Sequence, residues 1–211
     1  MKKYLLLIPL FLGTLFACEK NDLQINSTQE LQEENVAQMF AQRFIAFQDN
    51  LAQSNATQFR TSKGGIDLGS KTSVNSPEEL MLELEELHLN YDPVLLRLLG
   101  QSLNDIRTLE LRNQEDSEAF AENLDLAFQK AFPKSEANEV NLRRYAAAQD
   151  CRMCCARTYD DQREDISRDF IRCMTLGGGL LEPTIGWSCV AGATYEIIEN
   201  NIDLQNCLNG N

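Results

Sequence analysis

Apolar residues recur at helical spacing along most of this chain. Between residues 28 and 53 they are separated by 4, 4, 3 and 4 positions, which gathers them on one face of a helix. They are Val36, Phe40, Phe44, Phe47 and Leu51. The alternation of apolar and polar residues that marks strands is nearly absent. The pattern predicts an all-α fold.

Capping residues predict four further helices before residue 150. The first begins with Ser76-Pro77-Glu78-Glu79, where Ser caps, Pro fits the first helical position and Glu79 completes a capping box. It is expected to reach about Asn90 and to include His88, the single histidine, as a partly buried residue. The other three begin at Asp92, at Asp116 or Ser117, and at Ser135. The inward positions expected in these three helices are Leu95, Leu99, Ile106, Leu109, Phe120, Leu124, Phe128, Val140, Leu142 and Tyr145.

Two interruptions are expected in this part of the chain. Residues 54–75 are rich in Ser, Thr, Gly and Asn and have no apolar period, so a long mobile loop is predicted. Gly100 is a predicted kink in the helix that follows Asp92. Short turns join the other helices, and the whole of residues 28–150 is therefore expected to form a small helical bundle.

Six of the seven cysteines lie after residue 150: Cys151, Cys154, Cys155, Cys173, Cys189 and Cys207. An even number of clustered cysteines in an exported chain indicates disulfides. Cys155 and Cys173 are 18 positions apart, and so are Cys189 and Cys207. Eighteen residues are about five helical turns, or about 27 Å. The members of each pair therefore share a helix face but are too far apart to bond to each other.

A turn between the two cysteine-bearing helices is also written in the sequence. Gly177-Gly178-Gly179 is expected to end the first helix, and Pro183 fits the start of the second. The apolar residues expected to face the partner helix are Tyr159, Ile166, Phe170, Ala193, Ile197 and Leu204. Those expected to face solvent are Arg157, Asp160, Asp161, Arg163 and Glu164.

One hairpin centre brings two cysteine pairs together. Residue 181 is the midpoint of Cys173 with Cys189, and also of Cys155 with Cys207. We therefore expect a Cys173–Cys189 bridge near the turn, on which Trp187 would pack, and a Cys155–Cys207 bridge at the open end. Residues 151–211 are thus predicted to form a disulfide-stapled antiparallel α-hairpin.

Cys151 and Cys154 form the remaining pair, in a C-x-x-C arrangement. A third structural bridge, Cys151–Cys154, is the favoured interpretation, and a bridge from either residue to Cys207 is the alternative. A redox-active pair is a further hypothesis, because a cysteine in the first turn of a helix gains thiolate stability. The βαβ pattern typical of thioredoxin-like enzymes is missing. Zinc would need thiolates that stay unoxidised outside the cytoplasm, so we expect no metal and no cofactor.

The beginning of the chain has the layout of a secretory signal peptide. Lys2 and Lys3 precede an apolar stretch over residues 4–16 and the small residue Ala17. The apolar stretch is about 13 residues long, fewer than the ~20 that a transmembrane helix needs. Cleavage after Ala17 is therefore the expected outcome.

Cys18 directly follows this cleavage position. The run Leu15-Phe16-Ala17-Cys18 resembles the lipobox of bacterial lipoproteins, with Phe16 bulkier than the usual residue there. The polar residues 19–22 resemble the tethers of Bacteroidota lipoproteins. The resemblance implies that residues 1–17 are removed as a lipoprotein signal peptide and that Cys18 is acylated, for example with palmitate. Residues 18–27 would then be a polar tether to the cell envelope, at the outer membrane or cell surface.

Net charge limits the partners of this protein. With 19 basic and 32 acidic residues its net charge is −13, so nucleic acid is an unfavourable ligand. An isolated histidine without a G-x-S-x-G elbow gives little basis for Ser-His-Asp catalysis, and no phosphate-binding or dinucleotide-binding motif is present. The partners expected are a membrane, reached through the lipid on Cys18, and a protein.

Three functions are consistent with these patterns. The favoured hypothesis is a lipid-anchored, non-catalytic interaction or structural module of the envelope. The second is a precursor cleaved near Arg143-Arg144, which releases the cysteine-rich segment as a small peptide. Cys173, Gly178-Gly179, Leu180-Leu181, Ile185 and Ser188-Cys189 resemble the glycine-rich, cysteine-rich peptides of halocin-type bacteriocins. The third is a thiol–disulfide oxidoreductase that uses Cys151 and Cys154.

Overall fold

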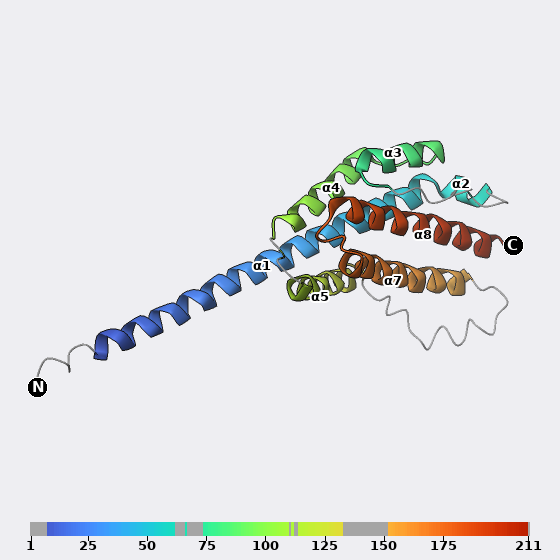
Figure 1. The fold of residues 1–211 in the computed structure, drawn as a ribbon. Coiled ribbons are helices and arrows are strands. Elements are labelled where there is room, and N and C mark those ends of the chain that lie inside the picture. The colour runs from blue at the N-terminus through green and yellow to red at the C-terminus, as the bar shows by residue number, and fades with distance from the viewer. Residues whose placement is uncertain are drawn as a thin grey trace, which may run out of the picture.

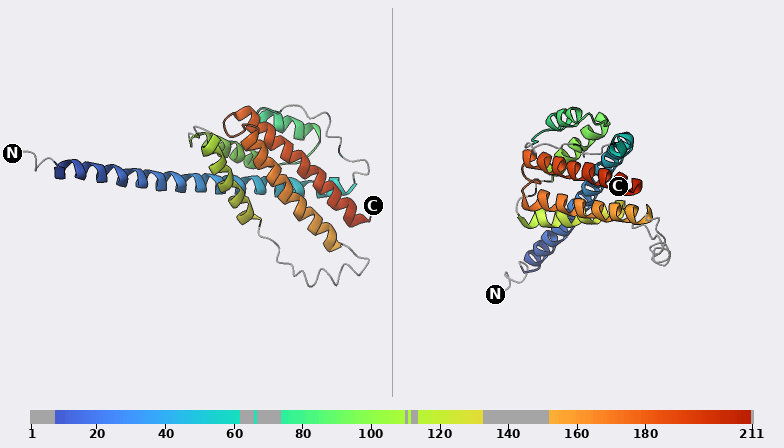
Figure 2. Two further views of the ribbon diagram at one scale, coloured as in Figure 1. Left: turned by 60° about the horizontal axis from the view of Figure 1, so that its bottom comes forward. Right: turned by 90° about the vertical axis from the view of Figure 1, so that its right-hand side faces the viewer.

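The computed structural model describes residues 8–61, 66, 74–109, 111, 114–132 and 152–210, without the side chains of residues 8–30, 114, 152 and 153. Within these ranges the secondary structure is helical and contains no strand, so the fold is all-α (Figure 1). The helices are α1 (Ile8–Ser54), α2 (Ala56–Thr61), α3 (Pro77–Glu86), α4 (Pro93–Arg107), α5 (Gln114–Ala131), α7 (Arg152–Leu176) and α8 (Pro183–Asn209). α1 packs against α4, α5 and α8, and α8 lies along α7 (Figure 2).

α1 begins much earlier than the sequence pattern predicts. The helix expected from Thr28 starts at Ile8 and includes residues 18–27, which were expected to be a tether. Leu and Ala before Cys18 and Glu, Gln and Lys after it favour helix. Pro9 lies at the second helical position, where its missing N–H breaks no helical hydrogen bond. Residues 8–30, which we call the N-terminal arm, project away from the bundle (Figure 1).

The prediction of one mobile loop over residues 54–75 is wrong at both of its ends. α2 lies inside this range, and the side chain of Phe59 is only 1% exposed. Asn55 Nδ2 donates to the carbonyl oxygen of Asn90 at 2.7 Å, and the Asn90 N–H donates back to Asn55 Oδ1 at 2.8 Å. Ser188 Oγ donates to the Val74 carbonyl at 2.8 Å. One phenylalanine and one asparagine make no period, so the sequence pattern could not reveal these attachments.

The predicted helix starts at Ser76 and Asp92 are confirmed. Ser76 Oγ accepts a hydrogen bond from the Glu79 N–H at 3.2 Å, and the Glu79 carboxylate accepts one from the Asn75 N–H at 2.6 Å. Asp92 Oδ1 accepts a hydrogen bond from the Val94 N–H at 2.8 Å. Each cap satisfies a backbone donor that the first helical turn leaves without a partner.

α3 ends at Glu86 rather than near Asn90, and His88 is the reason. The Leu89 N–H donates to the Leu84 carbonyl and the His88 N–H to the Glu85 carbonyl, both at 2.9 Å, which is a Schellman motif. His88 occupies its left-handed position with φ +57° and is exposed. The prediction of a partly buried, helical histidine is therefore wrong. Leu84 and Leu89 are both buried and supply the apolar contact that accompanies this motif.

α4 and α5 match their predicted inward faces in most positions. Leu99, Ile106, Phe120, Leu124 and Phe128 are all buried, whereas Leu95 is half-buried beside the fully buried Leu96. α4 is one continuous helix through Gly100. α5 ends at Ala131, before Pro133. The predicted helix from Ser135, with Val140, Leu142 and Tyr145, lies outside the described residues.

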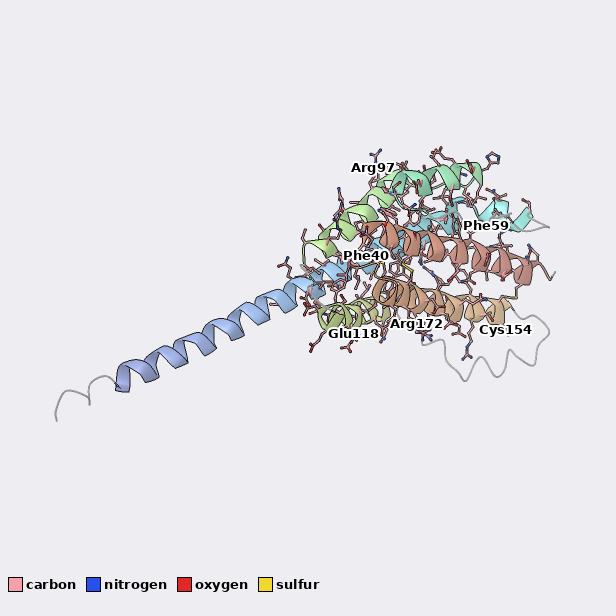
Figure 3. All side chains as sticks on the ribbon, viewed as in Figure 1. Phe40, Phe59, Arg97, Glu118, Cys154 and Arg172 are labelled. Carbon is pink, nitrogen blue, oxygen red and sulfur yellow. A yellow bond between two sulfur atoms is a disulfide. The ribbon has the colours of Figure 1, made fainter. Side chains whose placement is uncertain are left out.

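The cysteine-rich hairpin and the preceding helices share one hydrophobic core. The Phe170 ring of α7 stacks on Phe40 at 5.5 Å and on Phe44 at 4.8 Å, and meets Phe128 edge-on at 6.2 Å. α8 adds Val190, 0% exposed, to the same cluster. Figure 3 shows Phe40 and Phe59 inside the bundle, with Arg97 and Glu118 on its outer faces. The hairpin is thus part of the bundle rather than a separate tip.

Candidate functional site

Two disulfides fasten α7 to α8, in the pairs that the hairpin midpoint predicts. Cys173 bonds to Cys189 and Cys155 bonds to Cys207, with Cα–Cα distances of 5.7 and 5.8 Å. Both distances lie within the range for unstrained bridges. α7 ends at Leu176, before the three glycines, and α8 begins at Pro183, as expected. Disulfides of this kind indicate an oxidising, extracytoplasmic environment.

The two bridges differ in their surroundings. Cys189 is 3% exposed and belongs to the core, whereas Cys207 is exposed in the last turn of α8. Gly179 covers Cys189: a Cβ at this glycine would lie 2.9 Å from Met174 Sδ and 3.3 Å from Cys189 Sγ. The Cys173–Cys189 bridge therefore lies against the turn, with Cys173 half-buried and Cys189 buried, while the Cys155–Cys207 bridge closes the open end of the hairpin with Cys155 buried and Cys207 exposed.

Cys154 is half-buried in the first turn of α7 and is also disulfide-bonded. Its predicted partner, Cys151, lies outside the described residues, so the Cys151–Cys154 pairing stays a prediction. A cysteine held in a disulfide is not a thiolate nucleophile, and thiol chemistry at this position requires prior reduction.

Arg163 lies at the junction of α7 with α1. Its Nη2 lies 2.8 Å from Asp49 Oδ1, and its guanidinium lies over the Phe132 ring at 4.8 Å from the centroid. The side chain is 14% exposed, so the prediction that it faces solvent is wrong. The cysteine spacing defined only the α8-facing side of α7 and carried no information on α1 as a second neighbour. This junction is a polar contact that the sequence analysis missed.

Tyr159 extends the same junction toward α8. Its hydroxyl donates to Asn201 Oδ1 at 3.2 Å, and Asn200 Nδ2 donates to the Tyr159 carbonyl at 3.2 Å. Burial raises the pKa of the Tyr159 phenol, Arg163 opposes that rise and Asp49 adds to it. The phenol is therefore neutral at physiological pH and acts as a hydrogen-bond donor, not as a base.

A shallow groove runs between α1 and α5. Its volume is about 380 Å³, and it is lined by Gln38, Gln42, Ile45, Ala46, Asp49, Ala127, Lys130 and Ala131. The two charged lining residues are both engaged, because Lys130 Nζ lies 3.1 Å from Glu34 and Asp49 pairs with Arg163. The groove offers small apolar residues between amide side chains, which suits contact with a surface side chain rather than acid–base chemistry.

Trp187 and Gly100, both singled out in the sequence, lie against each other in the structure. Trp187, expected beside the Cys173–Cys189 bridge, has its ring in contact with Gly100 of α4, where a Cβ would lie 3.1 Å from Trp187 Cζ2. Gly100 thus allows a close approach of α8 to α4.

Within the described ranges, no cluster of three or more His, Cys, Asp or Glu side chains could hold a metal ion.

Cys18 belongs to α1, in its N-terminal arm. This arm projects from the bundle (Figure 1). In the part of the chain that the structure covers, none of the helices combines the length and apolar character needed to cross a bilayer. Comparisons with protein-family models, with curated proteins and with solved structures find no match for this chain.

Proposed function

We propose that this chain is a lipid-anchored protein of the bacterial cell envelope, attached through Cys18. In this proposal the helical bundle is a non-catalytic structural or interaction module. The observation that carries it is the N-terminal arm, which leaves the bundle as a helix and bears Cys18 away from the core. From Cys18 to Val36, the first buried residue among the described side chains of α1, a helix spans about 27 Å.

The chemistry of the described surface supports a non-catalytic role. The groove between α1 and α5 has its two charged groups, Asp49 and Lys130, already in ion pairs. The raised pKa of the Tyr159 phenol keeps this residue protonated. Acid–base catalysis needs a group that titrates near the working pH, and the protonated Tyr159 phenol does not supply one. The partner we propose is a protein, because the acidic chain repels nucleic acid.

The shared core weighs against the precursor hypothesis. Cleavage near Arg143-Arg144 would separate Phe170 and Met174 of α7 from Phe40 and Phe44 of α1. Phe170 is 2% and Met174 0% exposed, so a released segment would expose large apolar side chains to water. The oxidoreductase hypothesis is weakened by the all-helical setting of Cys154, which lacks the βαβ surroundings of thioredoxin-like enzymes.

Replacing Cys18 by alanine tests the anchor, because it removes the sulfur atom that would be acylated. Cells that produce the full chain are fed an alkyne analogue of palmitate, and the protein is recovered and labelled through the alkyne. Wild type and the control Asn21→Ala are expected to carry the label and to partition into a detergent phase. Cys18→Ala is expected to lose the label completely. Label on Cys18→Ala, or its absence from wild type, would show that the anchor is misassigned.

A further inference from the structure

The turn between α7 and α8 presents aliphatic side chains to solvent. We call residues 176–185 the apolar turn. Within it Leu176 is 78%, Leu181 57% and Ile185 36% exposed. Single exposed leucines are ordinary on protein surfaces, but a cluster in one short turn is typical of an interaction site.

The apolar turn is held in place rather than left free to fold inward. Leu180, which is 3% exposed, anchors it in the core, and the Leu180 N–H donates to the Met174 carbonyl at 2.9 Å. The Glu182 N–H donates to the Gly178 carbonyl at 2.9 Å, with Gly178 at φ +80°. The Cys173–Cys189 bridge joins the two helices beside it. The exposed side chains are therefore presented on a fixed backbone.

Charge distinguishes the apolar turn from the rest of the surface. Glu182 is the only charged residue between Thr175 and Ser188, although the chain as a whole carries −13. A stable protein interface buries ~800 Å² on each partner, which is much more than three aliphatic side chains can supply. A lipid surface accepts small apolar insertions of this kind.

The position of the apolar turn also favours contact with the bilayer in which the acylated Cys18 would be anchored. It lies at the end of the bundle from which the N-terminal arm projects, as two views show (Figures 1 and 2). A helix from Cys18 to Val36 spans about 27 Å, so an upright arm would hold the bundle, and the turn with it, away from the bilayer. The apolar turn can therefore contact the bilayer only if the arm lies along the membrane surface, which brings the bundle against the membrane.

We propose that the apolar turn inserts Leu176 and Leu181 into the interface of the bilayer that holds the acylated Cys18. This inference rests on the proposed lipid anchor and adds a second, reversible contact to it. The bundle then has one orientation on the membrane, with the turn facing the bilayer. Membrane attachment by two signals is stronger than attachment by one.

Quenching by brominated lipids tests the insertion. Acylated full-length protein carrying Trp187→Phe and Leu181→Trp is placed in phosphatidylcholine–phosphatidylglycerol vesicles with bromine on the acyl chains. We expect it to lose about half of its tryptophan emission, because interfacial elements bury roughly 5–10 Å into the bilayer. The matched control is Leu82→Trp in the same background, since Leu82 on α3 is 59% and Leu181 57% exposed. That control is expected to keep its emission.

The outcomes separate this inference from the anchor. If the protein floats with the vesicles but Leu181→Trp is no more quenched than Leu82→Trp, the inference is overturned and the anchor stands. If the acylated protein does not float with vesicles, both are overturned. Should Trp187→Phe fail to fold, a coumarin amino acid at position 181 or 82, with Trp187 retained, replaces tryptophan. Its emission must then shift toward that of an apolar medium at position 181 alone.

Discussion

Arg163 shows how one side chain joins the hairpin to the rest of the molecule. Its guanidinium makes a charge-assisted hydrogen bond to Asp49 and lies over two aromatic rings, Phe132 at 4.8 Å and Tyr159 at 5.6 Å. Its buried Nε has no hydrogen-bond partner among the described residues. The guanidinium is thus held by one ion pair and two ring contacts, with one of its N–H groups left without a partner.

Replacing Arg163 by methionine should loosen the contact of α7 with α1. Hydrogen bonds to charged groups contribute about 1.5–3 kcal/mol, and the half-exposed Asp49 places the expected loss near the lower end, about 1–2 kcal/mol. The control is Arg168→Met, because Arg168 is 57% exposed and pairs with Asp165 at 2.8 Å on the helix surface. That change should cost less than about 0.5 kcal/mol. Urea unfolding with intact disulfides gives both values, and equal losses would contradict the role assigned to Arg163.

Most of the buried apolar residues could be predicted, but the polar contacts at single residues could not. The helical spacing of apolar residues predicts that Phe40, Phe44 and Phe170 are buried. Arg163 and Asn55 are isolated polar residues, and their partners, Asp49 and Asn90, are distant in sequence. His88 looks helical because leucines surround it, although its backbone ends the helix.

At the scale of elements, the hairpin is where the sequence was most informative. Helical periodicity and a common midpoint favour Cys155 with Cys207 and Cys173 with Cys189, and the structure has these two pairs rather than the alternative bridge from Cys151 or Cys154 to Cys207. The same periodicity could not reveal that α1 continues to Ile8 or that α2 interrupts the loop. A helix of six residues is too short to show a period.

The two bridges should differ in their resistance to reduction. A thiolate must reach a sulfur atom along the disulfide axis. The more accessible cysteine of one bridge, Cys207, is exposed, whereas that of the other, Cys173, is half-buried and its partner Cys189 is 3% exposed beneath Gly179. We expect mild dithiothreitol to open Cys155–Cys207 first and to leave Cys173–Cys189 closed until the fold loosens. Alkylation followed by peptide mass mapping gives the order. Reduction of Cys173–Cys189 first, or of both together in the folded protein, would refute this assignment.

At the scale of the whole molecule, one core supports an arm at one end of the bundle. The sequence divides the chain into a bundle and a hairpin, yet Phe170 stacks on Phe40 and Phe44, so the two parts are stabilised together. Contacts between helices distant in sequence depend on how faces match in space, which a single sequence does not specify. The apolar turn and the N-terminal arm that contains Cys18 can be related to each other only from this arrangement of the helices.

The central claim is that Cys18 carries lipid and is the first residue of the mature protein. The most direct measurement is the mass of the N-terminal peptide from protein extracted from cell membranes with detergent. We predict a peptide that begins at Cys18 and bears fatty acyl groups, with residues 1–17 absent. A peptide that begins elsewhere, or a Cys18 that reacts as a free thiol, would contradict the claim.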